Sequence, residues 1–149
     1  MKALSGFLLI TLACLAAGCA PEQEQAPSVD LQAERAAAAA VVDAFGEIFV
    51  TEDMAAVERI FADDPDMVII GTDAAEYWTG FEPMRASYEA QFEAYDESTV
   101  ECRDQDVKVH ASGEVAWFSE RCDIQVTTGG EQVSVEGMRF SGVMEKRGA

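Results

Sequence analysis

The feature that most constrains the fold is a change in hydrophobic spacing near Asp96. Before this residue, apolar side chains recur at helical spacing, and after it they alternate as in strands. The second half holds three alternating segments, residues 98–110, 114–128 and 131–146, separated by short turns. Strands joined by such short turns pair antiparallel. We therefore predict an α+β fold, in which three N-terminal helices pack on a curved antiparallel sheet.

The first half supplies the helices. We predict them over residues 30–50, 54–61 and 83–95, with Asp30 capping the first and Pro83 in the first turn of the third. A short buried strand is expected at residues 67–71, followed by a loop over residues 72–83 that carries aromatic side chains.

The N-terminus has the pattern of an exported protein. Lys2 precedes an uncharged run that is too short to span a membrane, and small residues end it at Cys19. This resembles the lipobox of bacterial lipoproteins, which implies cleavage after residue 18 and lipid on Cys19. We predict a cell-envelope location, on the periplasmic face of the outer membrane or an extracellular face. An ordinary signal peptide, with Cys19 unmodified, is the alternative.

Residues 19–29 predict a disordered tether, because two prolines and alternating Glu and Gln offer little apolar surface to bury. Residues 30–149 are then one domain. The full chain is strongly acidic, with 28 Asp and Glu against 10 Lys and Arg. Such a charge repels nucleic acid and anionic lipid head groups, so the lipid anchor is the only membrane contact expected.

Two cysteines remain in the predicted mature domain, Cys102 and Cys122. A hairpin centred on Ser112 places them directly opposite each other, within reach of a disulfide. The same pairing would set Val107 against Trp117, which fits the apolar alternation poorly, and a one-residue bulge would change it. We expect a disulfide, with two buried thiols as the alternative.

Several segments in fixed order resemble the SnoaL-like domains of the nuclear transport factor 2-like superfamily, which also contains ketosteroid isomerase. The segments are "ADDPD", "WTG", "YEAQF" and "GEVAWF", and the resemblance covers residues 31–147. It implies a cone of three helices and a bent sheet around a pocket, and a homodimer. Such domains usually end with a further strand carrying Trp and His, and we expect that strand to be missing here. The sheet edge exposed in this way would invite a partner strand.

The catalytic candidates are weak. The resemblance implies a carboxylate base on the strand at residues 67–71, yet that strand has none, and Asp73 and Glu76 follow in the loop. His110 is expected at an exposed hairpin tip. We find no spacing typical of a metal site, a catalytic triad or a phosphate loop, and we expect no cofactor.

The binding candidates are aromatic and polar side chains expected near the pocket. They are Trp78, Tyr88, Gln91, Phe92, Trp117, Glu120 and Arg139. A hairpin centred on residues 129–130 would place Arg139 opposite Glu120, as an ion pair that either orients a ligand or is structural.

These features favour a lipid-anchored domain that binds a small apolar or amphipathic molecule or acts as an assembly module. The alternative is an isomerase, dehydratase or hydrolase-type enzyme acting on a small carbonyl compound, with Asp73 or Glu76 and Arg139 as its functional groups.

Overall fold

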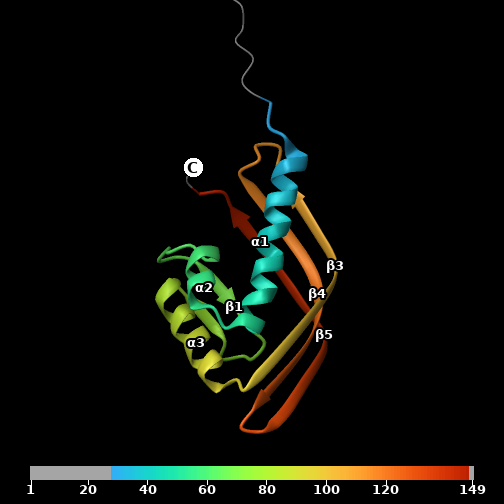
Figure 1. Ribbon diagram of the computed structural model, residues 1–149. Helices are drawn as coiled ribbons and strands as arrows, with labels where there is room; N and C mark the ends of the chain where they lie inside the picture. The colour runs from blue at the N-terminus through green and yellow to red at the C-terminus, as the bar shows by residue number, and fades with distance from the viewer. Residues whose placement is uncertain (1–27, 148–149) are drawn as a thin grey trace, which may run out of the picture.

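Figure 1 shows the computed structural model, which describes residues 28–147. The predicted signal peptide, Cys19 and most of the tether lie outside the described residues. Within them, the helices are α1 (Leu31–Thr51), α2 (Met54–Ile60) and α3 (Phe81–Ala94). The strands are β1 (Val68–Ile70), β2 (Tyr77–Thr79), β3 (Glu97–Val109), β4 (Val115–Thr128) and β5 (Glu131–Glu145). The predicted α+β class is confirmed.

Side-chain caps fix where the helices begin. The Asp30 carboxylate accepts hydrogen bonds from the backbone N–H groups of Gln32 and Ala33, at 3.0 and 3.1 Å. Asp53 caps α2 in the same way, accepting from the N–H of Ala55 at 2.9 Å. Between them Glu52 takes a left-handed conformation, with φ of 55°, which ends α1. The first two predicted helices therefore match the structure within a residue.

The strand predicted at residues 67–71 is β1, and it is less buried than predicted. It pairs with β2, inside the predicted loop, to form a separate antiparallel hairpin. Val68 is 47% exposed and Ile70 72% exposed, whereas Ile69 packs against the core. The strand is therefore buried on one side only, because its alternate side chains leave the hairpin towards solvent.

The strands β3, β4 and β5 form one antiparallel sheet in chain order. Cys102 lies opposite Cys122, as predicted. Two residues of β3, Asp104 and Gln105, then oppose Glu120 alone, and Asp104 has a left-handed φ of 56°. Beyond this bulge Val107 faces Phe118 rather than Trp117. The predicted register is thus right at the cysteines and wrong by one residue near the hairpin tip.

A second bulge lies in β5. Gly137 has a φ of 66°, and its N–H donates to the Asp123 carboxylate at 2.6 Å. The extra residue shifts the pairing, so that Arg139 lies opposite Arg121 and Glu120 lies opposite Phe140. The predicted Arg139–Glu120 ion pair is therefore wrong, because the two side chains leave the sheet on opposite faces.

The layers follow from these elements. α1 runs along the concave side of the sheet, and α2, α3 and β1 lie on the other side of α1 (Figure 1). The buried core belongs mainly to the helices, with Ile48, Val57, Met84, Tyr88 and Phe92 packed together. α1 packs mainly on β3, so much of the inner face of β5 is left without a helix over it. None of the helices in residues 28–147 is long and apolar enough to cross a bilayer.

Candidate functional site

An open cleft of about 1640 Å³ separates the inner face of β4 and β5 from the helical layer. Side chains of α1, β1, α3, β4 and β5 all border it. Its volume exceeds that of a typical pocket for a drug-sized molecule, which is roughly 300–1,000 Å³. The cleft therefore has room for a ligand of that size and for water.

One wall of the cleft is the inner face of the sheet. The side chains that alternate onto this face are almost all apolar: Ala116, Phe118, Ile124 and Val126 from β4, and Val133, Val135, Met138, Phe140 and Met144 from β5. Val133 is 58% exposed and Val135 40% exposed, although both point inward. The wall thus leaves apolar side chains in contact with solvent, as a binding surface does.

The floor of the cleft is aromatic. Phe45 of α1 packs edge-to-face on Phe140 and Phe118 of the sheet, with ring centroids 5.5 and 6.4 Å apart. Phe61 and Tyr88 continue this layer, 5.6 Å apart. These ring contacts therefore connect the helical layer to the sheet. They do not cover the rest of the inner face of the sheet.

The opposite wall carries polar groups of α3. Ser87 and Gln91 lie four residues apart on one face of α3, and Tyr95 follows as the residue at its C-cap. The Gln91 amide donates to the Ser87 hydroxyl at 3.1 Å and accepts from the Tyr95 hydroxyl at 3.2 Å. Burial raises the pKa of Tyr95 and that of the neighbouring Tyr88, so both phenols stay neutral. This wall offers hydrogen bonds without a charge.

A family model described as the SnoaL-like domain matches residues 38–149. The chain belongs to the SnoaL-like domain family. A comparison with curated proteins finds no match.

Solved structures share the fold. An NTF2-like superfamily protein from Salmonella enterica serovar Typhimurium has a TM-score of 0.68 at 13% sequence identity. The match covers 78% of this chain and 82% of that one. A candidate scytalone dehydratase from Novosphingobium aromaticivorans has a TM-score of 0.64 at 11% identity, covering 78% and 76%.

The SnoaL-like domain brings four of the predicted binding residues to the cleft, Arg139 and three others. Trp78, Tyr88 and Gln91 all line it. Phe92 is 8% exposed and belongs to the helical core, outside the residues that line the cleft. Trp117 is placed on the other face of the sheet, 43% exposed, because its neighbours Ala116 and Phe118 take the inner face.

The two catalytic candidates both shape the β1–β2 turn of the domain. One Glu76 oxygen accepts from the N–H groups of Thr72 and Asp73, at 2.5 and 3.0 Å. Asp73 in turn accepts from the N–H of Ala75 at 2.9 Å. Glu76 borders the cleft, and Asp73 lies outside its lining. β1 carries no carboxylate, and Glu76 is the carboxylate of the β1–β2 turn that borders the cleft.

Glu120 and Arg139 lie apart. Arg139 is exposed and borders the cleft at the edge of β5. Glu120 is only 4% exposed and lies outside the cleft lining, at the β3 bulge that faces α1. Burial raises the pKa of Glu120, the Gln105 amide at 3.5 Å lowers it, and the Asp43 charge raises it further.

His110 is exposed at the hairpin tip, as expected.

Sequence reasoning missed Ser87, Tyr95, Met138 and Phe140 as cleft residues. Ser87 and Tyr95 could have been found from their four-residue spacing around Gln91. Met138 and Phe140 could not, because the β5 bulge decides which face they take.

Proposed function

We propose that the SnoaL-like domain binds a small apolar or amphipathic molecule in the cleft. One observation carries this proposal: an apolar sheet wall, partly exposed at Val133 and Val135, faces an uncharged polar row on α3. An amphipathic molecule could rest its apolar body on the sheet and give its polar end to Gln91 and Tyr95.

Binding of 1-anilinonaphthalene-8-sulfonate, followed by its fluorescence, tests the site. Val135→Glu places a charge on the inner wall, and we expect it to weaken binding at least about tenfold, or 1.4 kcal/mol. Ser134→Glu is the matched control, because it adds the same charge one residue away on the outer face. Equal effects of the two changes would contradict the proposal.

The alternative is an isomerase, dehydratase or hydrolase-type enzyme acting on a small carbonyl compound. The candidate scytalone dehydratase described above shares the fold, and Glu76 is the carboxylate that borders the cleft in the β1–β2 turn. A turnover screen with steroid-like and polyketide-like carbonyl compounds separates the two functions. Conversion that is lost in Glu76→Gln while the turn keeps its structure would favour the enzyme.

An assembly role is the third candidate. A candidate calcium/calmodulin-dependent protein kinase II association domain from Xanthomonas campestris also shares the fold, with a TM-score of 0.61 at 20% identity, covering 74% of this chain and 76% of that one. The SnoaL-like resemblance also predicts a homodimer, and sedimentation of the protein in an analytical ultracentrifuge tests this prediction.

We also propose that Cys19 carries lipid and holds the domain at the cell envelope through the tether at residues 19–29. Support comes from the sequence pattern alone. Intact mass measurement and fractionation of wild type and Cys19→Ser test it: the variant should lose both the lipid mass and membrane association.

A further inference from the structure

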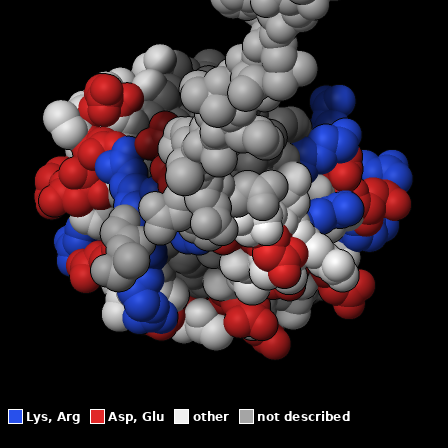
Figure 2. Space-filling view, turned by 90° about the horizontal axis from the view of Figure 1, so that it is seen from above, with Lys and Arg blue, Asp and Glu red and all other residues white. Residues whose placement is uncertain are grey.

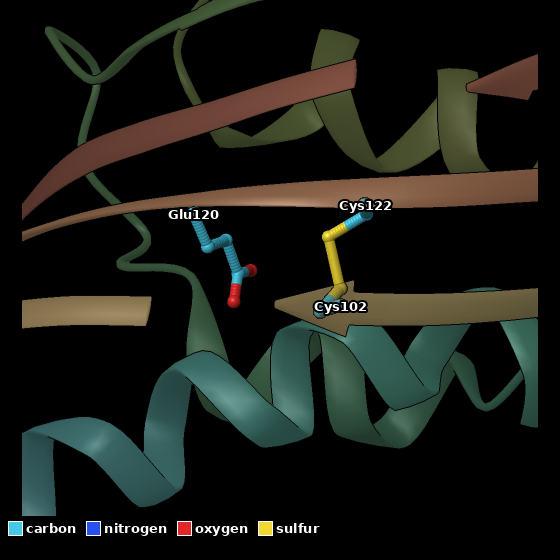
Figure 3. A group of neighbouring side chains, drawn as sticks. All are labelled: Cys102, Glu120 and Cys122. Carbon is cyan, nitrogen blue, oxygen red and sulfur yellow. A yellow bond between two sulfur atoms is a disulfide. The ribbon is translucent and has the colours of Figure 1, made fainter. Parts of the chain in front are cut away.

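The disulfide between Cys102 and Cys122 lies beside a buried carboxyl group. Figure 3 shows Glu120 and both cysteines between the sheet and α1. A carboxylate oxygen of Glu120 and the two sulfur atoms all lie within 4.8 Å of one another. Glu120 and Cys122 lie two residues apart on β4 and so share one face of the sheet, and the β3 bulge lies opposite Glu120.

The two cysteines differ in exposure. Cys102 is exposed on β3, an edge strand of the described sheet, and Cys122 is fully buried on the central strand. α1 crosses near the disulfide at Gly46, where a Cβ atom would lie 3.8 Å from the Cys102 sulfur. The missing side chain leaves this sulfur the more approachable of the two. An incoming thiolate would therefore attack Cys102, and Cys122 would be the leaving group.

A thiolate on Cys122 would form without water around it, which is costly. A neutral acid beside it removes this cost by giving it a proton. Glu120 has the required position, and its Oε1 atom has no hydrogen-bond partner among residues 28–147. Burial and the charge of Asp43 raise the pKa of Glu120 and favour its neutral form. An unpaired buried polar atom is uncommon in proteins, and a redox role is one of its recognised causes.

We propose that Cys102–Cys122 is a redox-active disulfide that exchanges with an external dithiol, and that Glu120 is the proton donor to Cys122. A thiolate of the dithiol attacks Cys102; a mixed disulfide forms, the Cys102–Cys122 bond breaks, and Glu120 protonates the departing Cys122 sulfur. The second thiol of the dithiol gives its proton to solvent and attacks the dithiol's own sulfur in the mixed disulfide, which breaks the bond to Cys102. Cys102 leaves as a thiolate, and both it and Glu120 then take a proton from water. The dithiol is oxidised to a disulfide, and the protein gains two thiols.

The rate of reduction by dithiothreitol under native conditions tests the proposal on the full chain. Samples are quenched with an alkylating reagent, and peptide mass spectrometry counts the labels on Cys102 and Cys122. We expect reduction without loss of the circular-dichroism signal of the sheet. Glu120→Gln should slow it about tenfold, less than the largest effects of general acids because a thiolate is a moderate leaving group.

Three variants keep the result interpretable. Glu101→Gln is the matched control, because it makes the same Glu-to-Gln change at an exposed residue beside Cys102 and should leave the rate unchanged. Glu120→Asp retains a carboxyl group and should recover part of the lost rate, which a purely structural role for Glu120 would not produce. Gly46→Ala adds a methyl group in van der Waals contact with the Cys102 sulfur and should slow attack about twofold or more.

Two results would overturn the proposal. In one, reduction occurs only as fast as the whole domain unfolds, which is the behaviour of a structural disulfide. In the other, Glu120→Gln reacts at the wild-type rate. If Glu120→Gln fails to fold, Glu120→Asp and Gly46→Ala decide the outcome, and wild-type rates in both would reject it.

Discussion

A buried carboxyl group with an unpaired oxygen lowers stability when it is charged, and Glu120 is such a group. Because burial and Asp43 raise its pKa in the folded protein above the ordinary value of 4.5, the folded state binds the proton more tightly than the unfolded chain. The resulting stability is present below the unfolded pKa and is lost as pH rises through the folded pKa.

We predict that Glu120→Gln raises the free energy of unfolding at pH 8 by about 1 kcal/mol, because a neutral amide replaces the charged group. Below pH 4.5, where the wild-type carboxyl group is neutral in both states, the difference should shrink towards zero. Urea unfolding at both pH values measures it. A variant that is less stable than wild type at pH 8 would contradict this account.

Gly137 sets the register of β5. Its φ of 66° favours glycine, and no other atom lies within 4 Å of where a Cβ would stand. We therefore predict that Gly137→Ala costs about 1 kcal/mol of unfolding free energy, from backbone strain alone. Ser141→Ala, on the same strand, is the control. A loss well above this amount would show that the bulge itself has been abandoned for another register.

At the scale of elements, hydrophobic spacing predicted the helices and the long strands, since each is long enough to show its period. β2 has only three residues, too few to display alternation, and was predicted as loop. The bulges were the main obstacle to predicting the site. Each inserts one residue whose position depends on tertiary contacts, such as the Gly137–Asp123 hydrogen bond, and each changes the partner of every residue beyond it. The cysteine pairing was predictable, but the place of Arg139 was not.

The disulfide joins β3 to β4 between the two bulges, with a sequence separation of 20. Closing a loop of this length restricts the unfolded chain and stabilises the fold by about 3 kcal/mol in the chain-entropy model. We predict a loss of this size when Cys102 and Cys122 are both changed to serine, measured by urea unfolding at pH 7. No loss would mean that packing alone holds the two strands in register.

For the whole molecule, the sequence predicted a helical layer against a curved sheet, and the family comparison confirmed the domain type. The sequence did not predict how much of the inner face of β5 would be left without a helix over it. At the end of the molecule where α1 begins, basic and acidic side chains lie next to one another (Figure 2). Lys146 pairs there with Glu34 at 2.7 Å, and Arg147 pairs with Asp64, so the residues after β5 are joined to α1 and to the loop that follows α2.

The central claim is that ligands bind in the cleft and not on the outer face of the sheet. The two tryptophans of the chain report on these two surfaces, because Trp78 lines the cleft and Trp117 lies on the outer face. A brominated fatty acid is a suitable amphipathic probe, since bromine quenches tryptophan fluorescence at short range. In Trp117→Phe, which leaves Trp78, the account predicts saturable quenching. In Trp78→Phe, which leaves Trp117, it predicts little change, and stronger quenching of Trp117 than of Trp78 would contradict it.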